Sequence, residues 1–197
     1  VPATIKDNPT ANEAEYIKSL SHLDPITRAQ VLAGDWDAMA SGKFMRHWFK
    51  ITPVVPARGR FVRYWDLAAT EAAPGKDPSW TVGALVGTSG GQYFIADIKR
   101  GRFRPKGVED LVVQTANLDG QQIVIRMEQE PGASGVDVIR HYTTLLAGYD
   151  FKGDKVTGPK ELRANALASQ AEAGNVLVLQ MPWNNLLLDE LEIFPGG

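Results

Sequence analysis

The sequence predicts an α/β domain built on a mixed β-sheet with helices on both faces. Three strand-like runs follow one another between residues 61 and 101, and consecutive strands joined by short turns favour antiparallel pairing. Helical and strand-like segments then alternate along the second half of the chain, which favours parallel strands joined by crossover helices. One mixed sheet accommodates both halves of this pattern.

The first three strands are expected where aromatic and β-branched residues dominate and where turn-forming stretches separate the runs. Their sequences are FVRYWDLAA (61–69), WTVGALVG (80–87) and QYFIADIKRG (92–101). A helix over PKGVEDLVVQTANL (105–118) follows, because its apolar residues recur at helical spacing. The residues expected on its buried side are Val108, Leu111, Val112 and Leu118.

The second half of the chain alternates between the two kinds of element. Its predicted elements are a strand over 121–130, a helix over 136–148, a helix over 159–174, a strand over 175–180 and a helix over 183–194. The helix over 136–148 has the clearest apolar face. That face consists of Val136, Ile139, Tyr142 and Leu146.

Residues 1–57 have a different character from residues 58–197. Two short amphipathic stretches have Asn12 and Asp24 as expected N-caps, and aromatic residues scattered among Gly and Pro follow them. We interpret residues 1–57 as a linker or docking segment and residues 58–197 as the folded domain.

The composition is that of a globular protein, with 44% hydrophobic and 22% charged residues among 197. No run approaches the roughly 18 apolar residues of a membrane span, and the first residues lack the pattern of a signal peptide. The absence of cysteine excludes thiolate metal sites. The net charge of −2 gives no global reason to bind nucleic acid, so such a role needs a local patch.

The acidic residues Asp66, Glu128 and Glu130 are the candidates for chemistry. Asp66 lies in a strand that otherwise looks buried, and the two glutamates lie near the end of the fourth strand. If these strands are neighbours, the carboxylates approach one another, and a divalent cation would compensate their repulsion. Two such ions assist phosphoryl transfer. The alternative is that Asp66 pairs with Arg63, with Arg126 or with a backbone amide, and that the glutamates are solvated.

Two basic groups are candidates for binding a phosphate backbone. The first has period-two spacing within KRGRFRPK, and it would line one edge if the stretch were extended. It consists of Arg100, Arg102, Arg104 and Lys106. The alternative is an edge strand protected from aggregation by its charges. The second group lies near a helix start, and it consists of Lys155, Lys160 and Arg163.

Several motifs together resemble the C-terminal nuclease domain of the large terminase subunit of tailed bacteriophages, with the linker that precedes it. YWDLAAT is similar to the first catalytic strand of that family, and MEQEPGASG to its second acidic motif. The segments DNP…EYIKSL and LAGDWDAMASGKF…WF resemble the linker to the packaging ATPase. The stretch GDKVTGPKELRANALASQAEAGNVLVL resembles the helix and strand that follow the second motif.

The resemblance implies a ribonuclease H-like fold and an endonuclease that uses Mg²⁺ or Mn²⁺, two ions being expected, to cut concatemeric double-stranded viral DNA. By motif position Asp66 corresponds to the first catalytic aspartate. The second acid lies five residues before Gly135, which selects Glu130, with Glu128 as an additional or alternative metal ligand. The implied partners are DNA, the ATPase domain of the same subunit, the small terminase subunit and the portal, in the cytoplasm of the bacterial host.

The chain departs from the family pattern in its last residues. The third carboxylate of the family lies in an Asp-rich run shortly after an FP-G turn, and the chain stops at FPGG. We therefore expect weak metal binding and little or no cleavage from a chain that ends at Gly197. No GxxxxGK[ST] motif occurs, so no ATP site is expected.

Two other functions are compatible with the same residues. The first is another ribonuclease H-like nuclease, of the junction-resolvase type, although a docking segment over residues 1–57 argues against it. The second is a non-catalytic module of the packaging motor that grips DNA or docks on a partner, and such a module would bind no metal between the first and fourth strands.

Overall fold

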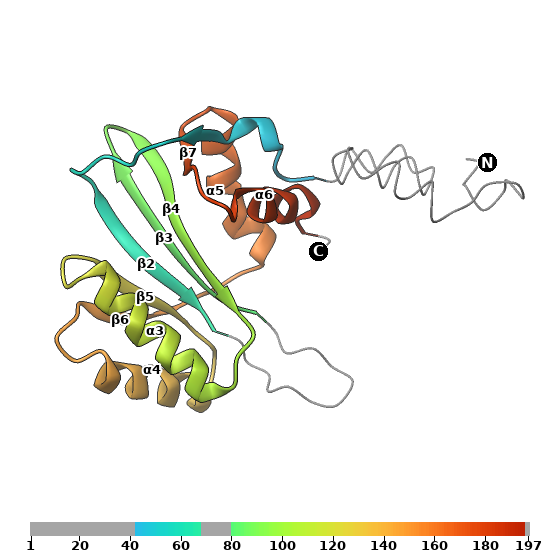
Figure 1. The fold of residues 1–197 in the computed structure, drawn as a ribbon. Coiled ribbons are helices and arrows are strands. Elements are labelled where there is room, and N and C mark those ends of the chain that lie inside the picture. The colour runs from blue at the N-terminus through green and yellow to red at the C-terminus, as the bar shows by residue number, and fades with distance from the viewer. Residues whose placement is uncertain (1–41, 68–79, 196–197) are drawn as a thin grey trace, which may run out of the picture. The chain divides into compact units, whose positions relative to one another are not determined.

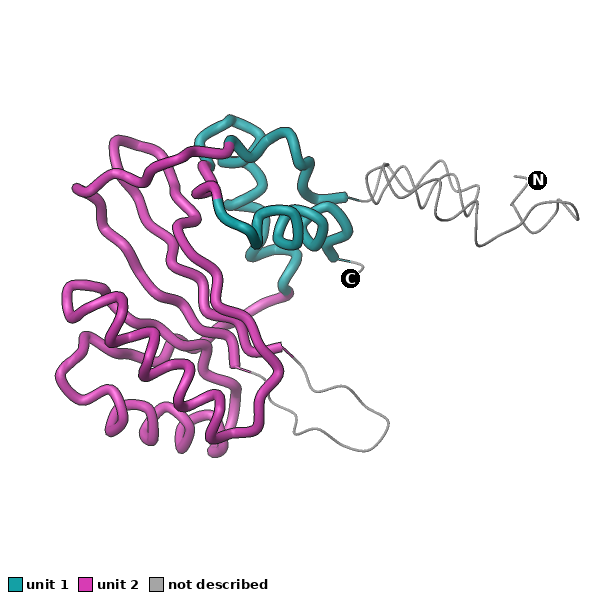
Figure 2. The backbone as a smooth tube through the Cα atoms, in the orientation of Figure 1, with its two compact units in different colours: residues 1–50, 160–176, 181–197 teal, residues 51–159, 177–180 magenta. Residues whose placement is uncertain are grey.

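A computed structural model describes residues 42–67 and 80–195 of the chain. The helices expected near Asn12 and Asp24 lie outside these residues. The chain divides into two compact units (Figure 2): unit 1 comprises residues 1–50, 160–176 and 181–197, and unit 2 comprises residues 51–159 and 177–180. Among the described residues, no helix has both the length and the apolar character needed to cross a membrane.

The predicted mixed sheet is confirmed, and its seven strands follow the order β1-β7-β4-β3-β2-β5-β6. The antiparallel part joins β2 to β3 and β3 to β4, and the parallel part joins β2 to β5 and β5 to β6. The strands, seen in Figure 1, are β1 (Lys50–Thr52), β2 (Arg60–Asp66), β3 (Thr81–Ser89), β4 (Gln92–Gly101), β5 (Val124–Gln129), β6 (Phe151–Lys155) and β7 (Val176–Leu179).

Two strands were not anticipated from the sequence. Strand β1 lies in the segment interpreted as a linker, and β6 lies in a stretch to which no element was assigned. Strand β4 is an interior strand between β7 and β3. The strand order therefore does not support the alternative that the basic run belongs to an edge strand.

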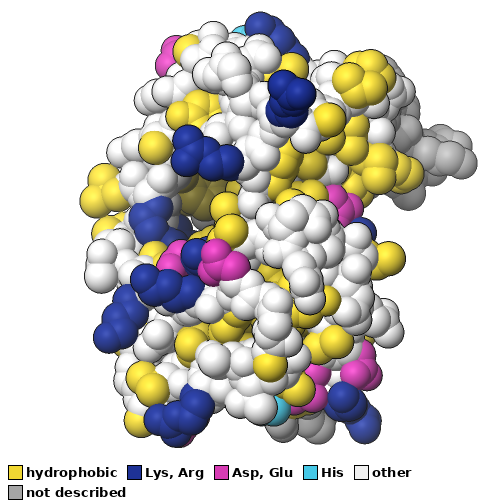
Figure 3. Space-filling view, turned by 90° about the vertical axis from the view of Figure 1, so that its left-hand side faces the viewer, with side chains coloured by type: hydrophobic (Ala, Val, Ile, Leu, Met, Phe, Trp, Pro, Cys, Tyr) yellow, Lys and Arg dark blue, Asp and Glu magenta, His cyan; other side chains and the backbone are white. Residues whose placement is uncertain are grey.

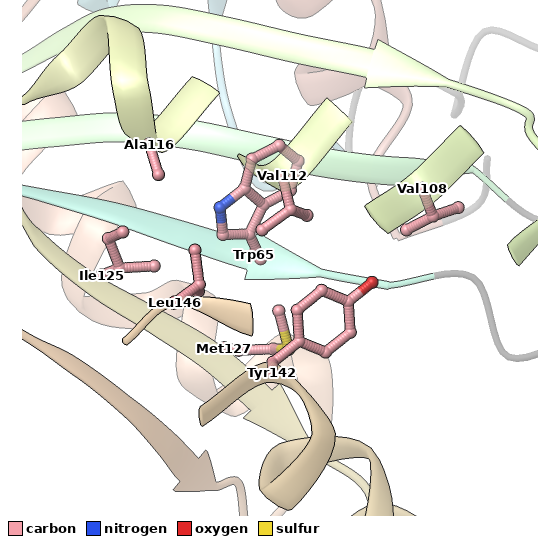
Figure 4. Packing of buried hydrophobic residues seen from close by; sticks show 8 residues of the cluster. All are labelled: Trp65, Val108, Val112, Ala116, Ile125, Met127, Tyr142 and Leu146. Atoms are coloured by element: carbon pink, nitrogen blue, oxygen red, sulfur yellow. The ribbon is translucent and has the colours of Figure 1, made fainter. Parts of the chain in front are cut away.

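Helices α3 (Pro105–Asp119) and α4 (Ala133–Leu145) cover one face of β2, β5 and β6 and form the main core with them. Trp65 and Met127 are fully buried at its centre, and Val112, Tyr142 and Leu146 pack around them (Figure 4). The period-two pattern of β2 and β5 sends these residues to the helix face, because successive side chains of a strand alternate between faces.

The expected buried sides of the two helices were correct except at their ends. Val108, Val112 and Tyr142 are buried, whereas Leu118 is 80% exposed and Val136 is 43% exposed. Leu118 lies one residue before the end of α3, and Val136 lies in the first turn of α4. Helical spacing therefore identified the correct faces but not how far the core extends along each helix.

Unit 1 contains the short 3-10 helix η4 (Arg46–Trp48) together with α5 (Lys160–Glu172) and α6 (Asn184–Ile193). Two ion pairs connect η4 to α6, because Arg46 pairs with Asp189 and with Glu192. Phe44 packs against the rings of Phe49 and Phe194. These contacts fasten residues 43–49 to the last helix.

A buried ionic network around Arg63 joins β2 to three other elements. The Arg63 side chain is 1% exposed. Its guanidinium donates to both carboxylate oxygens of Asp119 at 2.8 and 3.0 Å, to Asp97 at 2.8 Å and to the Gly83 carbonyl at 3.0 Å. Asp119 ends α3, Asp97 lies on β4 and Gly83 on β3. Because a buried guanidinium needs its acceptors, this network fixes the position of β2.

The first prediction concerns this network. Replacing Asp119 with Ala should lower the free energy of unfolding by about 3–5 kcal/mol, because it removes the bidentate partner of a buried charge. Urea denaturation followed by circular dichroism measures the change. Asp137→Ala is the matched control, since Asp137 pairs with Arg140 on the exposed surface of α4 and should cost less than about 1 kcal/mol. Equal losses in the two variants would contradict the role of the network.

The second prediction concerns the pH dependence of stability. Burial raises the pKa of Tyr142 to about 12, and the nearby Glu109 carboxylate adds to this effect. The unfolded chain releases the phenolic proton near pH 10, whereas the folded chain retains it until about pH 12. The stabilisation is therefore complete below pH 10 and is lost as the pH rises from 10 to 12.

Between pH 10 and pH 12 the parent should lose on the order of 2 kcal/mol of unfolding free energy through this phenol, and Tyr142→Phe should not show that loss. The unfolding free energy at pH 7 should be nearly the same in both proteins. Thermal denaturation at pH 7 and from pH 10 to 12 tests it. Tyr93→Phe is the control, because Tyr93 is 41% exposed. The same alkaline profile for Tyr142→Phe and the parent would show that this phenol does not control the effect.

Candidate metal centre and nucleic-acid interface

The carboxyl ends of β2 and β5 bring two acidic residues into register. The parallel pairing aligns Trp65 with Met127, and the next residue along each strand is acidic, Asp66 on β2 and Glu128 on β5. Neighbouring strands lie roughly 4.8 Å apart, so the two Cα atoms lie at about that separation. The expectation that the first and fourth strands of the domain are neighbours is confirmed.

Both acidic side chains belong to the sheet face opposite α3 and α4. Trp65 and Met127 point into the helix-covered core, and alternation turns Asp66 and Glu128 to the other face. Asp66 is the last residue of β2 and is exposed, whereas Glu128 is half-buried. The expectation of a mid-strand, buried Asp66 was therefore wrong, and burial imposes no large energetic penalty on this carboxylate.

Glu130 lies beyond the end of β5, in the turn before α4, and its side chain is exposed. Its backbone runs very close to the first turn of α4, since a Cβ atom on Gly135 would lie 2.0 Å from the Glu130 carbonyl oxygen. Gly135 is thus required by the turn itself. The last aligned pair of β2 and β5 is Trp65 with Met127, so Asp66 and Glu128 directly follow it, whereas Glu130 lies two residues further along the chain.

A third carboxylate, which the sequence did not suggest, continues this row. Asp154 on β6 is in register with Glu128 and is half-buried. The only sequence signal for it was an aspartate in a short stretch between two helices. Within residues 42–67 and 80–195, no three or more His, Cys, Asp or Glu side chains form a group that could hold a metal ion. The described candidate is therefore the Asp66–Glu128 pair, with Asp154 one strand further.

The two arginines that were alternative partners of Asp66 bind other groups. Arg63 points to the helix face and pairs with Asp97 and Asp119. Arg126 pairs with Asp150 at 3.0 Å. Neither arginine supports the simple ion-pair interpretation of Asp66.

The basic run at residues 99–106 does not form one extended edge, contrary to the sequence interpretation. Arg100 lies near the end of β4, Arg102 and Arg104 lie in the following loop, and Lys106 lies in α3. Lys106 is engaged by the carboxylates of Asp110 and Glu109, which raise its pKa. Lys106 therefore lies in a locally neutralised cluster.

Arg100 and Arg102 are both held against one aromatic ring. Their guanidinium carbons lie 3.8 and 4.3 Å from the centroid of the Trp80 indole, within the range of a cation–π interaction. Arg100 is in register with Val82, and Val82 with Asp66. The two arginines and Asp66 therefore occupy the same end of the sheet in unit 2.

The second basic group is divided between the two units. Lys155 ends β6 in unit 2, and Lys160 and Arg163 lie in the first turn of α5 in unit 1. The helix start expected near residue 159 is confirmed by α5, which begins at Lys160.

Comparison with known families identifies the domain. The family model described as the terminase RNase H-like domain matches residues 63–196. The chain belongs to this family. The match includes the second half of β2 with Asp66, β5 with Glu128, and every helix from α3 to α6. A comparison with curated proteins gave no match.

Solved structures of terminase proteins share the fold. The large terminase nuclease of the thermophilic phage G20c, with bound magnesium, is 18% identical, with a TM-score of 0.55 over 77% of this chain and 79% of that one. The large terminase nuclease domain of Thermus phage P74-26 is 14% identical, with a TM-score of 0.50 over 75% and 74% of the two chains. The large terminase of a further thermophilic bacteriophage is 12% identical, with a TM-score of 0.50 over 90% of this chain and 44% of that one. The expected ribonuclease H-like fold is thereby confirmed.

Proposed function

We propose that this chain is the nuclease domain of a bacteriophage large terminase, a divalent-metal endonuclease that cuts concatemeric double-stranded viral DNA during genome packaging. The observation that carries the proposal is that Asp66 and Glu128 directly follow the aligned pair Trp65 and Met127 at the carboxyl ends of two parallel strands. Membership of the terminase family and the shared fold support it.

The donor set fits Mg²⁺ or Mn²⁺. Hard divalent cations prefer carboxylate oxygens, and Asp66 and Glu128 offer these from adjacent strands on a face with no covering core helix of unit 2. Metal-bound structures of the G20c nuclease contain magnesium, zinc or cobalt, which supports a divalent ion for this chain too. We propose that two such ions bind at this site. Bound there, they would supply electrostatic stabilisation to the phosphodiester and favour its attack by water.

We assign the principal ligand roles to Asp66 and Glu128. Glu130 remains a candidate because of its spacing to Gly135, but it projects from a turn beyond the strand. The in-register position of Glu128 is the reason for preferring it.

The DNA-contact roles are assigned by position. Arg100 and Arg102 stack on Trp80 at the end of the sheet that carries Asp66, where guanidinium groups favour a phosphate backbone. Arg104 follows them in the same loop. Lys155, Lys160 and Arg163 would contribute through long-range attraction, whereas Lys106 is neutralised by Asp110 and Glu109 and would contribute little.

The proposed partners are double-stranded DNA, the ATPase domain of the same subunit, the small terminase subunit and the portal, and the proposed compartment is the cytoplasm of the bacterial host. A longer large terminase from a thermophilic bacteriophage, of which this chain covers 44%, supports a larger subunit as the context. A non-catalytic module that grips DNA is the second candidate, favoured by the absence of a three-ligand group among the described residues.

The third prediction tests the nuclease directly. In a large terminase subunit that contains this domain, tested with Mn²⁺ and supercoiled plasmid, Asp66→Asn and Glu128→Gln should each lower the cleavage rate by at least the roughly 10–100-fold that loss of an outer-shell partner of a metal typically costs. Glu130→Gln should have a smaller effect. Isothermal titration calorimetry should show that Asp66→Asn and Glu128→Gln weaken Mn²⁺ binding more than Glu130→Gln does. Asp137→Asn is the control for loss of one surface carboxylate.

Cleavage by Asp66→Asn at the parental rate would contradict the catalytic assignment. A parent that binds DNA but neither binds Mn²⁺ nor cleaves would favour the non-catalytic module. A larger loss in Glu130→Gln than in Glu128→Gln would exchange the roles of the two glutamates.

A further inference from the structure

A groove lies at the end of unit 2 that the proposed chemistry does not use. Its volume is about 720 Å³, and it is formed where the start of β2 meets the turn between β3 and β4. Polar side chains line it, chiefly Arg58, Arg60, Thr88, Gln92 and Tyr93. Figure 3 views the molecule from the side on which this end lies in Figure 1, and Lys and Arg are more widespread there than Asp and Glu.

The backbone around the groove is fixed by specific contacts. The Ser89 hydroxyl donates to the Arg58 carbonyl at 2.7 Å, and Arg60 is in register with Thr88. Gly59 allows the two segments to approach, since a Cβ there would lie 3.1 Å from the Thr88 carbonyl oxygen. The groove is therefore a defined feature of the strand pairing.

The turn at the rim of the groove leaves space for a large ligand. Gly90 and Gly91 have φ values of +58° and +79°, as hairpin turns of this kind require. A Cβ at either position would meet no atom within 4 Å. The groove is therefore open to solvent on the side of this turn.

The charge of the groove is positive and locally uncompensated. Arg58 and Arg60 are exposed, no acidic residue lines the groove, and no described residue accepts a hydrogen bond from either guanidinium. Arginine forks suit phosphate oxygens. Tyr93, 41% exposed, adds an aromatic surface beside them.

Arg60 of the groove and Asp66 of the acidic pair lie on the same face of strand β2. Arg60 and Asp66 are the first and last residues of β2, and an even separation of six residues puts their side chains on one face. At about 3.3 Å per residue, six steps span roughly 20 Å. That length corresponds to about six base pairs of B-form DNA.

We propose that this groove binds the sugar–phosphate backbone of the DNA duplex about six base pairs from the position cut at Asp66 and Glu128. The inference rests on the proposed function and adds a second contact that sets how the duplex lies along β2. Duplex DNA is favoured over a small anion because the groove is open at the rim and its Arg60 is aligned with Asp66 along β2.

The fourth prediction uses the double variant Arg58→Gln/Arg60→Gln, with Arg140→Gln as the matched control. Arg140 is also an exposed arginine, but it lies on α4. Fluorescence anisotropy with a duplex of about 24 base pairs in Ca²⁺ should show about 5- to 30-fold weaker binding for the double variant. The slope of log K against log salt should fall by about 2, since each phosphate contact contributes roughly 0.9. Arg140→Gln should match the parent.

An unchanged affinity and slope in the double variant would overturn the groove proposal. Inorganic phosphate, added to the parent at constant ionic strength, should leave duplex affinity within about twofold. A fall to the level of the double variant would make the groove a small-anion site and would also overturn the proposal. Plasmid cleavage by the parent is scored separately, so a failure of the nuclease assignment is distinguished from a failure of the groove.

Discussion

The parallel register of β2 and β5 is the constraint on which the candidate site depends. A slip of one residue would turn Asp66 or Glu128 onto the opposite face of the sheet, into the core beneath α3 and α4. Two buried side chains of β2 resist such a slip. Trp65 is fully buried in the core, and Arg63 is held by Asp97, Asp119 and the Gly83 carbonyl. The site is therefore positioned by residues that take no part in its chemistry.

Because side chains alternate along β2, its two faces have different roles. Residues Phe61, Arg63 and Trp65 share the helix face, and Phe61 and Trp65 lie against Gly87 and Gly83, where a Cβ would meet their rings at 2.3 and 2.5 Å. The opposite face carries Arg60 at one end and Asp66 at the other. One seven-residue strand thus contributes to the core, to the acidic pair and to the groove.

Much of the fold could be predicted from the sequence, because strong periodicity marks β2 to β5, α3 and α4. Strand β6 could not, since FKGDK has little apolar alternation. Its place depends on Gly153, where a Cβ would meet Ile139 at 2.6 Å, and on pairing with β5. Asp154 escaped notice for the same reason.

The candidate site was predicted in outline but not in geometry. The types and order of Asp66, Glu128 and Glu130 suggested paired carboxylates, while the choice between the glutamates required the strand register. The exposure of Asp66 followed from the point at which β2 ends, which the apolar run YWDLAA concealed. The stacking of Arg100 and Arg102 on Trp80 depends on a loop conformation that no spacing rule describes.

The groove at the β3–β4 turn escaped sequence reasoning for a related reason. Arg58 and Arg60 lay at the boundary assigned to the linker, and the Ser89-Gly90-Gly91 stretch indicated only a turn. Their chemistry becomes apparent when antiparallel pairing brings the two segments together. The sequence thus indicated the two segments separately, whereas the pairing of the strands determined that they lie together.

The most direct measurement is a crystal structure of the chain soaked in Mn²⁺, with anomalous scattering recorded at the manganese edge. We expect an anomalous peak within coordination distance of carboxylate oxygens of both Asp66 and Glu128. A peak bound only by other residues, or no peak at Mn²⁺ concentrations that support cleavage, would contradict it.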